Sequence, residues 1–209
     1  MPTGWYVCSM AVTAREKLLD AALGVIRAQG YAGTSVDELC ARAGVTKGAF
    51  FHHFRSKDAL AVAAADHWSA TTSALFAGAD YHRHEDPLDR LIAYVDFRKD
   101  LIRGSIPEFT CLVGTMVQEA FGASDEIREA CRRSIEGHAE TLEADFAAAL
   151  VRYNVRGATA KSLALYTQAA LQGAFILAKA ANDASVAIDC IGHLKTYVML
   201  LFGRRDCSI

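Results

Sequence analysis

The side chains best suited to chemistry lie between Thr34 and Lys57, where hydroxyl, basic and imidazole groups alternate with small residues. Small residues beside hydrogen-bond donors allow a helix to approach base edges and phosphates closely, as binding in a DNA major groove requires. We therefore expect this segment to contact DNA. The candidate contact residues are Thr34, Ser35, Thr46, Lys47, Gly48, Ala49, Phe51, His52, His53, Arg55 and Lys57.

These candidates divide into two roles. Thr34 and Ser35, at a helix N-terminus, are expected to hold a phosphate with the help of free backbone N–H groups, and Lys57 to hold one through its charge. The segment 46–49 is placed to meet the groove, with the two adjacent histidines near the groove edge or the phosphate backbone.

Two short helices joined by a glycine turn position these side chains. Ser35 caps the first helix, and Glu38 three residues later is expected to complete a capping box. Gly44 ends that helix because glycine readily adopts the positive φ of a helix C-terminus. Thr46 caps the second helix, which presents a polar and basic side outward. A preceding helix, from about residue 13 to 30, packs beneath both and completes a helix-turn-helix unit.

The stretches GTSVDEL, AGVTKGAFFHHF and SKDAL, in this order and spacing, closely resemble the N-terminal domain of the TetR family of bacterial transcriptional regulators. The resemblance covers about residues 13–60 and implies a homodimer that binds a palindromic operator, most often as a repressor. Two positions depart from the family pattern. Phe51 stands where a phosphate-binding tyrosine is common, and Arg55 where proline is frequent, so we expect Arg55 to supply a compensating phosphate contact.

Length and composition predict an all-α fold. The chain has 209 residues, a hydrophobic fraction of 52% and only three prolines, which suits packed helices and a substantial core. We expect about nine helices. An N-terminal tail at 1–12 precedes a three-helix helix-turn-helix DNA-binding domain at 13–56 and a larger C-terminal ligand-binding and dimerisation domain at 57–209.

Positive charge is concentrated near the N-terminus. Residues 13–60 hold seven Lys and Arg against five Asp and Glu, whereas the whole chain has 22 against 24. Attraction to phosphates is therefore confined to the N-terminal part. The first twelve residues have no signal-peptide pattern, and no later segment offers about eighteen uninterrupted apolar residues, so we expect a cytoplasmic protein with no membrane partner.

Caps and prolines predict the remaining helices. Ser56 caps a long fourth helix, which we expect to connect the two domains as a lever. Asp86 followed by Pro87 opens a fifth helix, and Pro107 opens a sixth, ending near residues 103 and 121. Three further helices are expected at about 124–153, 158–182 and 185–202.

The last two helices carry apolar stripes that we expect to form a four-helix interface with a second copy. The alternative is burial in the core of a single subunit. The candidate interface residues are Ala170, Gly173, Ala174, Leu177 and Ala178 on the first helix, and Ile188, Ile191, Leu194, Val198 and Leu201 on the second.

A small-molecule effector is expected to enter the helical body and change the separation of the two DNA-binding domains, preferring the conformation that does not bind DNA. Aromatic and sulfur-bearing residues are the candidate lining, with plain core packing as the alternative, and they favour an apolar or aromatic ligand. They are Trp68, Phe76, Tyr94, Phe97, Cys111, Met116 and Phe146.

Other chemistries have weaker support in the sequence. The histidine pairs lack the spacing and companion ligands of a metal site, and no nucleophile with a base or phosphate-binding glycine loop indicates an enzyme or a cofactor. Six cysteines without CxxC pairing predict neither disulfides nor zinc. Two alternatives stay open: control through oxidation or electrophile modification of Cys111, and a helical module that binds a protein instead of DNA.

Overall fold

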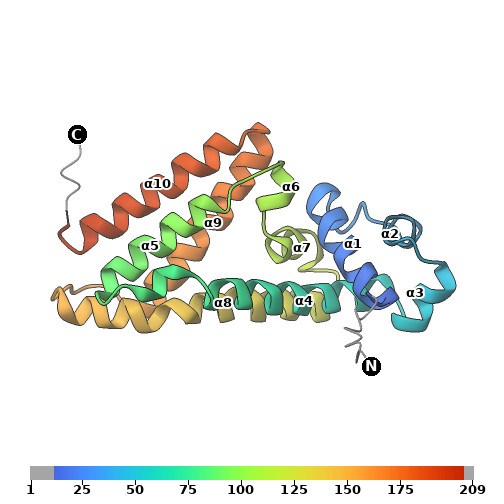
Figure 1. Ribbon diagram of the computed structural model, residues 1–209, viewed down its shortest axis with the longest axis horizontal. Helices are drawn as coiled ribbons and strands as arrows, with labels where there is room; N and C mark the ends of the chain where they lie inside the picture. The colour runs from blue at the N-terminus through green and yellow to red at the C-terminus, as the bar shows by residue number, and fades with distance from the viewer. Residues whose placement is uncertain (1–11, 205–209) are drawn as a thin grey trace, which may run out of the picture.

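The structure, a computed structural model, describes residues 12–204 and is helical throughout that range, which confirms the predicted all-α class (Figure 1). The expected tail, apart from Val12, lies outside the described residues, as do cysteines 8 and 207. The elements are α1 (Ala14–Gln29), α2 (Val36–Ala43), α3 (Lys47–His53), α4 (Lys57–Ala77), the 3-10 helix η1 (Asp80–Arg83), α5 (Pro87–Asp100), α6 (Ile106–Phe109), α7 (Leu112–Ala120), α8 (Asp125–Arg152), α9 (Ala160–Ala181) and α10 (Ala184–Leu201).

Local capping and a small core fix the first three helices. Thr13 Oγ1 accepts a hydrogen bond from Glu16 N at 3.2 Å, and the Glu16 carboxylate accepts one from Thr13 N at 2.7 Å, which completes a reciprocal capping box. Leu18, Leu39 and Phe50, one from each helix, are fully buried in a common cluster. The helix-turn-helix unit is therefore held by both its ends and its interior.

The core of these helices continues into later parts of the chain. Leu112 and Met116 of α7, with Ile127 and Cys131 of α8, are buried in the same cluster. The helices α1, α4, α7 and the start of α8 consequently pack as one body around a shared cluster of buried side chains.

The rest of the molecule is built along two long helices, α4 and α8. α4 and α8 run side by side along its length, and α5, α9 and α10 form the end opposite α1 to α3 (Figure 1). Their core contains Leu88, Tyr94, Phe146, Leu171 and Ile191, all almost completely buried. Between the two ends of the molecule lies a cavity whose wall includes residues of both α1 and α9.

The predicted sixth helix is in fact two helices, α6 and α7. Thr110 and Cys111 are extended, with ψ angles of 157° and 126°, and Cys111 Sγ caps α7 by accepting a hydrogen bond from Gly114 N at 3.4 Å. The break between α6 and α7 contains neither glycine nor proline. Its N-cap residue is Cys111, which is not a usual sequence signal for a helix start. This division gives ten α-helices in the described chain instead of the expected nine, and η1 was not predicted either.

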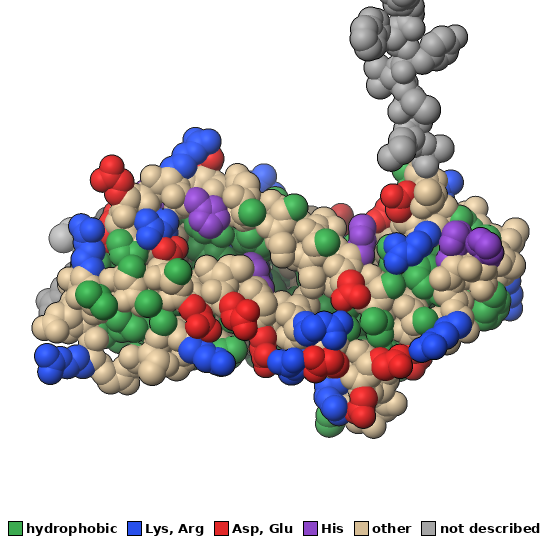
Figure 2. Space-filling model, turned by 90° about the horizontal axis from the view of Figure 1, so that it is seen from below, with side chains coloured by type: hydrophobic (Ala, Val, Ile, Leu, Met, Phe, Trp, Pro, Cys, Tyr) green, Lys and Arg blue, Asp and Glu red, His purple; other side chains and the backbone are tan. Residues whose placement is uncertain are grey.

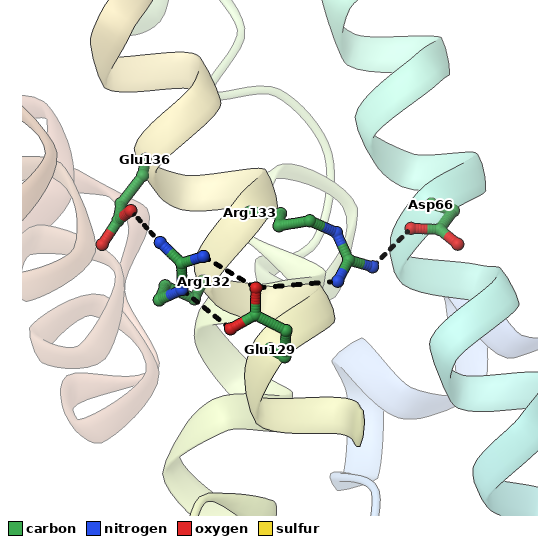
Figure 3. A network of polar contacts seen from close by, with 5 residues as sticks. All are labelled: Asp66, Glu129, Arg132, Arg133 and Glu136. Atoms are coloured by element: carbon green, nitrogen blue, oxygen red, sulfur yellow. Dashed lines mark hydrogen bonds and ion pairs between the residues drawn. The ribbon is translucent and has the colours of Figure 1, made fainter. Parts of the chain in front are cut away.

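A surface network of ion pairs joins α4 to α8 (Figure 3). Arg133 contacts Asp66 of α4 at 3.4 Å and Glu129 at 3.8 Å, while Arg132 pairs with Glu129 at 2.7 Å and with Glu136. Single exposed pairs contribute little, but a shared network holds its members in one geometry. It therefore helps to fix the position of α4 against α8.

Candidate nucleic-acid interface and internal pocket

The turn between α2 and α3 has the predicted geometry. Ser35 Oγ accepts from Glu38 N at 3.2 Å and Thr46 Oγ1 from Ala49 N at 3.1 Å, so each helix has its N-cap. Gly44 is left-handed, with φ 65° and ψ 37°. One detail was wrong: Glu38 does not close a capping box, because its carboxylate accepts a hydrogen bond from Gln29 Nε2 at 2.6 Å.

α3 separates its side chains cleanly into two sets. Phe50 is completely buried, and Phe54 directly after the helix is nearly so. Lys47, Gly48, Phe51, His52 and His53 are exposed, as are Ser35, Thr46 and Arg55, while Ala49 is half-buried. Histidine side chains gather at the α3 end of the molecule in Figure 2. These residues form what we call the α3 surface: Ser35, Thr46, Lys47, Gly48, Ala49, Phe51, His52, His53 and Arg55.

Gly48 gives the α3 surface a place for close contact. A Cβ added there would meet only Thr46 Oγ1, at 3.7 Å, which is an ordinary van der Waals distance. Packing within the subunit therefore does not require glycine at this position. A partner that lies directly against the backbone of α3 does benefit from its absence of a side chain.

One predicted phosphate contact, Thr34, is wrong, and the other, Lys57, is already hydrogen-bonded within the subunit. Thr34 is buried, and its hydroxyl donates to Gly30 O at 2.6 Å. Lys57 Nζ donates to Tyr31 O and Thr34 O, each at 3.0 Å, and lies 4.3 Å from the centre of the Tyr31 ring. Both side chains hold the loop between α1 and α2 in place. The Thr34 hydroxyl has no donor left for a phosphate, whereas the Lys57 ammonium keeps one N–H.

The internal pocket is a cavity of about 270 Å³ between the N-terminal helices and the body. α4, α5, α6, α8 and α9 contribute to its wall, and Arg27 brings α1 into it. Three of the predicted lining residues, Trp68, Phe76 and Cys111, do line the cavity. A hollow lined by hydrophobic side chains is visible midway along the molecule in Figure 2.

Four other predicted lining residues are not part of the cavity wall. Met116 and Phe146 are buried in the two hydrophobic clusters, and Tyr94 is almost fully buried behind the wall. Phe97 packs on Phe76, with ring centroids 5.5 Å apart. Core residues and pocket-lining residues have the same helical spacing in the sequence. Only the tertiary arrangement shows which residues belong to which group.

The polar part of the wall was not predicted. Arg98 of α5, His138 of α8, and Gln168 and Gln172 of α9 all line the cavity. Their signal in the sequence is weak: Gln168, Gln172 and Phe175 recur at helical spacing on a helix whose stripe otherwise reads as apolar.

A hydrogen-bonded group lies behind this polar wall. The Tyr94 hydroxyl and His138 Nε2 share a hydrogen bond of 2.9 Å, and Gln168 Nε2 donates to the same hydroxyl at 3.4 Å. Burial, together with the nearby Arg98 guanidinium, lowers the pKa of His138 to about 4. The imidazole is therefore neutral at pH 7.

Arg27 connects the cavity to the DNA-proximal helices. Its Nε donates to Leu23 O at 2.8 Å and its Nη1 to Glu108 O at 3.0 Å, and the guanidinium lies 5.1 Å from the Trp68 ring centre. One side chain thus contacts α1, α4 and α6. Burial lowers the pKa of Arg27, which remains charged at neutral pH.

The predicted dimer residues fall into two groups. Leu177 is exposed, and Ala170, Gly173, Ile188 and Leu201 are half-buried. The interface prediction is wrong for five residues that face inward. α9 and α10 pack on each other and on α5 and α8, which buries Ala174, Ala178, Ile191, Leu194 and Val198 within the subunit. The outward apolar face of these helices, which we call the α9/α10 face, instead carries Leu165, Tyr166, Ile176, Leu177, Tyr197 and Leu200.

No group of three His, Cys, Asp or Glu side chains is arranged to hold a metal ion within residues 12–204. The four cysteines of that range, Cys40, Cys111, Cys131 and Cys190, are free thiols.

Two family descriptions match the chain. Residues 18–64 match the model of bacterial regulatory proteins of the tetR family, and residues 87–190 match that of the C-terminal domain of LmrA/YxaF-like transcriptional regulators. The first match contains the α3 surface and the second most of the body.

Curated relatives and a solved structure agree. LmrA of Bacillus subtilis is 25% identical over 82% of this chain and 89% of its own length. The repressor NemR of Escherichia coli is 31% identical, over 59% of this chain and 62% of NemR. The chain covers smaller shares, 19% and 55%, of two other regulators, YerO of Bacillus subtilis and AcuR of Cereibacter sphaeroides.

A TetR transcriptional regulator of Chloroflexus aurantiacus has a crystal structure with a TM-score of 0.75 to this fold. It is 28% identical, over 89% of this chain and 94% of that one. Helix order, helix-turn-helix geometry and both family matches lead to one conclusion: the chain belongs to the TetR family, whose members are DNA-binding transcriptional regulators and not enzymes.

Proposed function

We propose that this protein is a cytoplasmic repressor that binds a palindromic operator as a homodimer and leaves it when a small apolar or aromatic effector enters the internal pocket. TetR-family regulators bind operator DNA and act as dimers. LmrA and NemR are named as a transcriptional regulator and a repressor, respectively. Support from this chain comes from the α3 surface, the internal pocket and the α9/α10 face.

One observation supports effector control above all: Arg27 of α1 and Trp68 of α4 form part of the pocket wall. A ligand in this cavity touches the helix beneath the helix-turn-helix unit and the helix that connects it to the body. A ligand that binds one position of these helices better than another shifts the population between the two, and therefore the affinity for DNA.

The α9/α10 face supports dimerisation. Six large apolar side chains, each 39–60% exposed, lie on these two helices. α10 is also long and apolar enough to cross a membrane by length and composition alone. In a DNA-binding regulator, a second copy of the same face is the partner that covers such a surface, and its two-fold symmetry matches a palindrome.

A mobility-shift titration against the DNA upstream of this protein's own gene, at two salt concentrations, tests the proposal. Binding is expected to weaken steeply with salt because phosphate contacts release counterions. Arg55→Ala is expected to weaken binding roughly three- to ten-fold on operator and unrelated DNA alike, and to reduce the salt slope by about one.

Glu126→Gln is the matched control for Arg55→Ala. Glu126 pairs with Arg55 at 3.6 Å, with both side chains exposed, so its neutralisation should leave DNA affinity unchanged or slightly higher. Absence of a shift at low salt would reject DNA binding and favour the protein-interaction module. A loss in Arg55→Ala limited to one operator position would reject its role as a general phosphate contact.

A second form of control is supported by the position of Cys111. Its sulfur lines the internal pocket and accepts the Gly114 N–H at the start of α7. An electrophile held in the pocket would lie within reach of this thiol. Treatment with N-ethylmaleimide should then add one mass increment at Cys111 and abolish the DNA shift in the wild type but not in Cys111→Ser. An unchanged response of Cys111→Ser to inducers favours reversible ligand binding.

A further inference from the structure

The cavity wall holds two guanidinium groups that differ in their partners. Arg27 already donates to two backbone carbonyl oxygens. Arg98 instead lies over two aromatic rings, 5.2 Å from the centre of Phe76 and 5.8 Å from that of Phe175. Within residues 12–204 it forms no ion pair with a carboxylate. A guanidinium has five N–H donors, and Arg98 is the guanidinium of the wall whose donors are less committed to other protein groups.

Nearby carboxylates are committed elsewhere. Glu108 is the one acidic residue of the cavity wall in the described chain, and its Oε2 accepts from both N and Oγ of Ser105, each at 2.6 Å. Asp145 pairs with Arg90 at 2.7 Å, and Asp96 with Lys195 at 2.8 Å. None of these groups neutralises Arg98 directly.

The imidazole of the wall adds no negative charge. His138 is neutral at pH 7, since burial and Arg98 lower its pKa to about 4. With Arg27 and Arg98 against Glu108, the wall carries an excess of one positive charge. Aromatic rings from Trp68, Phe76, Phe109 and Phe175 supply the apolar remainder.

We propose, building on the function proposed above, that the effector is an apolar aromatic anion whose carboxylate or sulfonate pairs with Arg98 while its rings contact the aromatic wall. A guanidinium offers paired N–H donors that match two oxygens of such a group. The attraction is stronger in a partly dry cavity than in water. A volume of about 270 Å³ suits a ligand of one to three rings.

Two fluorescent dyes of nearly the same shape test the charge requirement. 1-Anilinonaphthalene-8-sulfonate is an anion, and N-phenyl-1-naphthylamine is the same scaffold without the sulfonate. Their dissociation constants are measured for the full chain in a Trp5→Phe background, where Trp68 is the single remaining tryptophan. Energy transfer from Trp68, which lines the internal pocket, reports that a dye is bound near this residue.

The anionic dye is expected to bind at least ten-fold more tightly than the neutral dye. Arg98→Met, which keeps a long apolar side chain, should abolish this preference and leave binding of the neutral dye within about three-fold. Arg98→Lys should keep part of the preference because it keeps the charge. Arg103→Met, a change of an exposed arginine outside the cavity wall, is the matched control and should behave as the parent protein.

Equal affinity for both dyes, or a preference that survives in Arg98→Met, would overturn the anion requirement while leaving the pocket and the proposed regulator intact. Failure of both dyes to show energy transfer from Trp68 would overturn the pocket as a ligand site, and the inference with it. The mobility shift on upstream DNA reports separately on DNA binding, so failure of the regulator itself is distinguishable from either result.

Discussion

Single side chains in this protein acquire their roles from their surroundings. Gly48 and Lys57 both belong to the segment that resembles the DNA-binding part of the family. Gly48 lies open on the α3 surface, whereas Lys57 is occupied by two carbonyl oxygens of the α1–α2 loop. Substitution of Lys57 should therefore affect the α1–α2 loop. Substitution of Gly48 should affect the binding of a partner that lies against α3.

His138 makes stability depend on pH. Its pKa is about 4 in the folded protein, below the unfolded value of about 6.5. The unfolded state therefore binds more protons between these values, so the contribution of the neutral imidazole is complete above pH 6.5 and is lost as pH falls toward 4. We expect the free energy of unfolding to fall by about 1.5 to 2 kcal/mol between pH 7 and 5 from this group.

Urea denaturation of the wild type and His138→Gln at both pH values measures this term. Glutamine keeps a hydrogen-bonding group near the Tyr94 hydroxyl but does not titrate. The decrease between pH 7 and 5 should be smaller in His138→Gln by the stated amount. Parallel pH profiles of the two proteins would contradict the assignment.

Among the elements, α1 has two functions because it packs both under the helix-turn-helix unit and against the body. Arg27 joins it to α4 and α6 at the internal pocket, and Glu119 of α7 accepts the N–H of Ala32 at 2.7 Å. The break between α6 and α7 matters here, since it turns Glu108 and Cys111 toward the same cavity. A continuous sixth helix would not have offered this arrangement.

Arg27→Met should weaken the coupling between the internal pocket and DNA. The methionine keeps apolar contact with Trp68 but loses both hydrogen bonds to carbonyl oxygens. We expect operator affinity to change by less than about three-fold, and the ratio of operator affinities without and with effector to shrink about ten-fold, a coupling loss of roughly 1.4 kcal/mol. The effector is one selected by its rise in melting temperature and its release of DNA.

Arg15→Met is the matched variant for this measurement. Arg15 is also on α1 and also lies over an aromatic ring, 5.6 Å from the centre of Phe54, but it is outside the cavity wall. The Arg15→Met protein should retain the wild-type ratio of operator affinities without and with effector. An Arg27→Met protein that responds to effector as fully as Arg15→Met would remove Arg27 from the coupling route.

At the scale of the whole molecule, the two ends of the subunit differ in surface character. The helix α3 and the pair α9 and α10 lie at opposite ends of the molecule (Figure 1). The α3 surface is polar and basic, whereas the α9/α10 face is apolar. Apolar surface on this scale is uncommon on monomers, and pairing it with a second copy removes it from water.

Leu177→Glu should therefore convert the dimer to a monomer. Leu177 is 52% exposed on the α9/α10 face, and a carboxylate there would be buried opposite its own symmetry mate. Analytical ultracentrifugation should report half the wild-type mass and the mobility shift should lose at least ten-fold in affinity. Val151 of α8 is 83% exposed, and Val151→Glu should leave both the mass and the DNA affinity unchanged. A dimeric Leu177→Glu protein would place the interface elsewhere.

The sequence alone determined the features that depend on neighbouring residues. Ser35, Gly44 and Thr46 predicted their caps and turn correctly because capping involves atoms within a few residues. The all-α class and most helix bounds followed from periodicity in the same way. The family resemblance in this segment is confirmed for the same reason, since the motif is local.

Tertiary structure alone decided which residues face a cavity, a partner or the core. Arg27 and Arg98 are far apart in the chain and were not predicted as lining, yet both reach the internal pocket. Ile191 was predicted to meet a second copy and is buried against its own subunit, whereas Leu200 on the same helix is exposed. Helical spacing identifies an apolar stripe, but the identity of its partner depends on packing between helices distant in sequence.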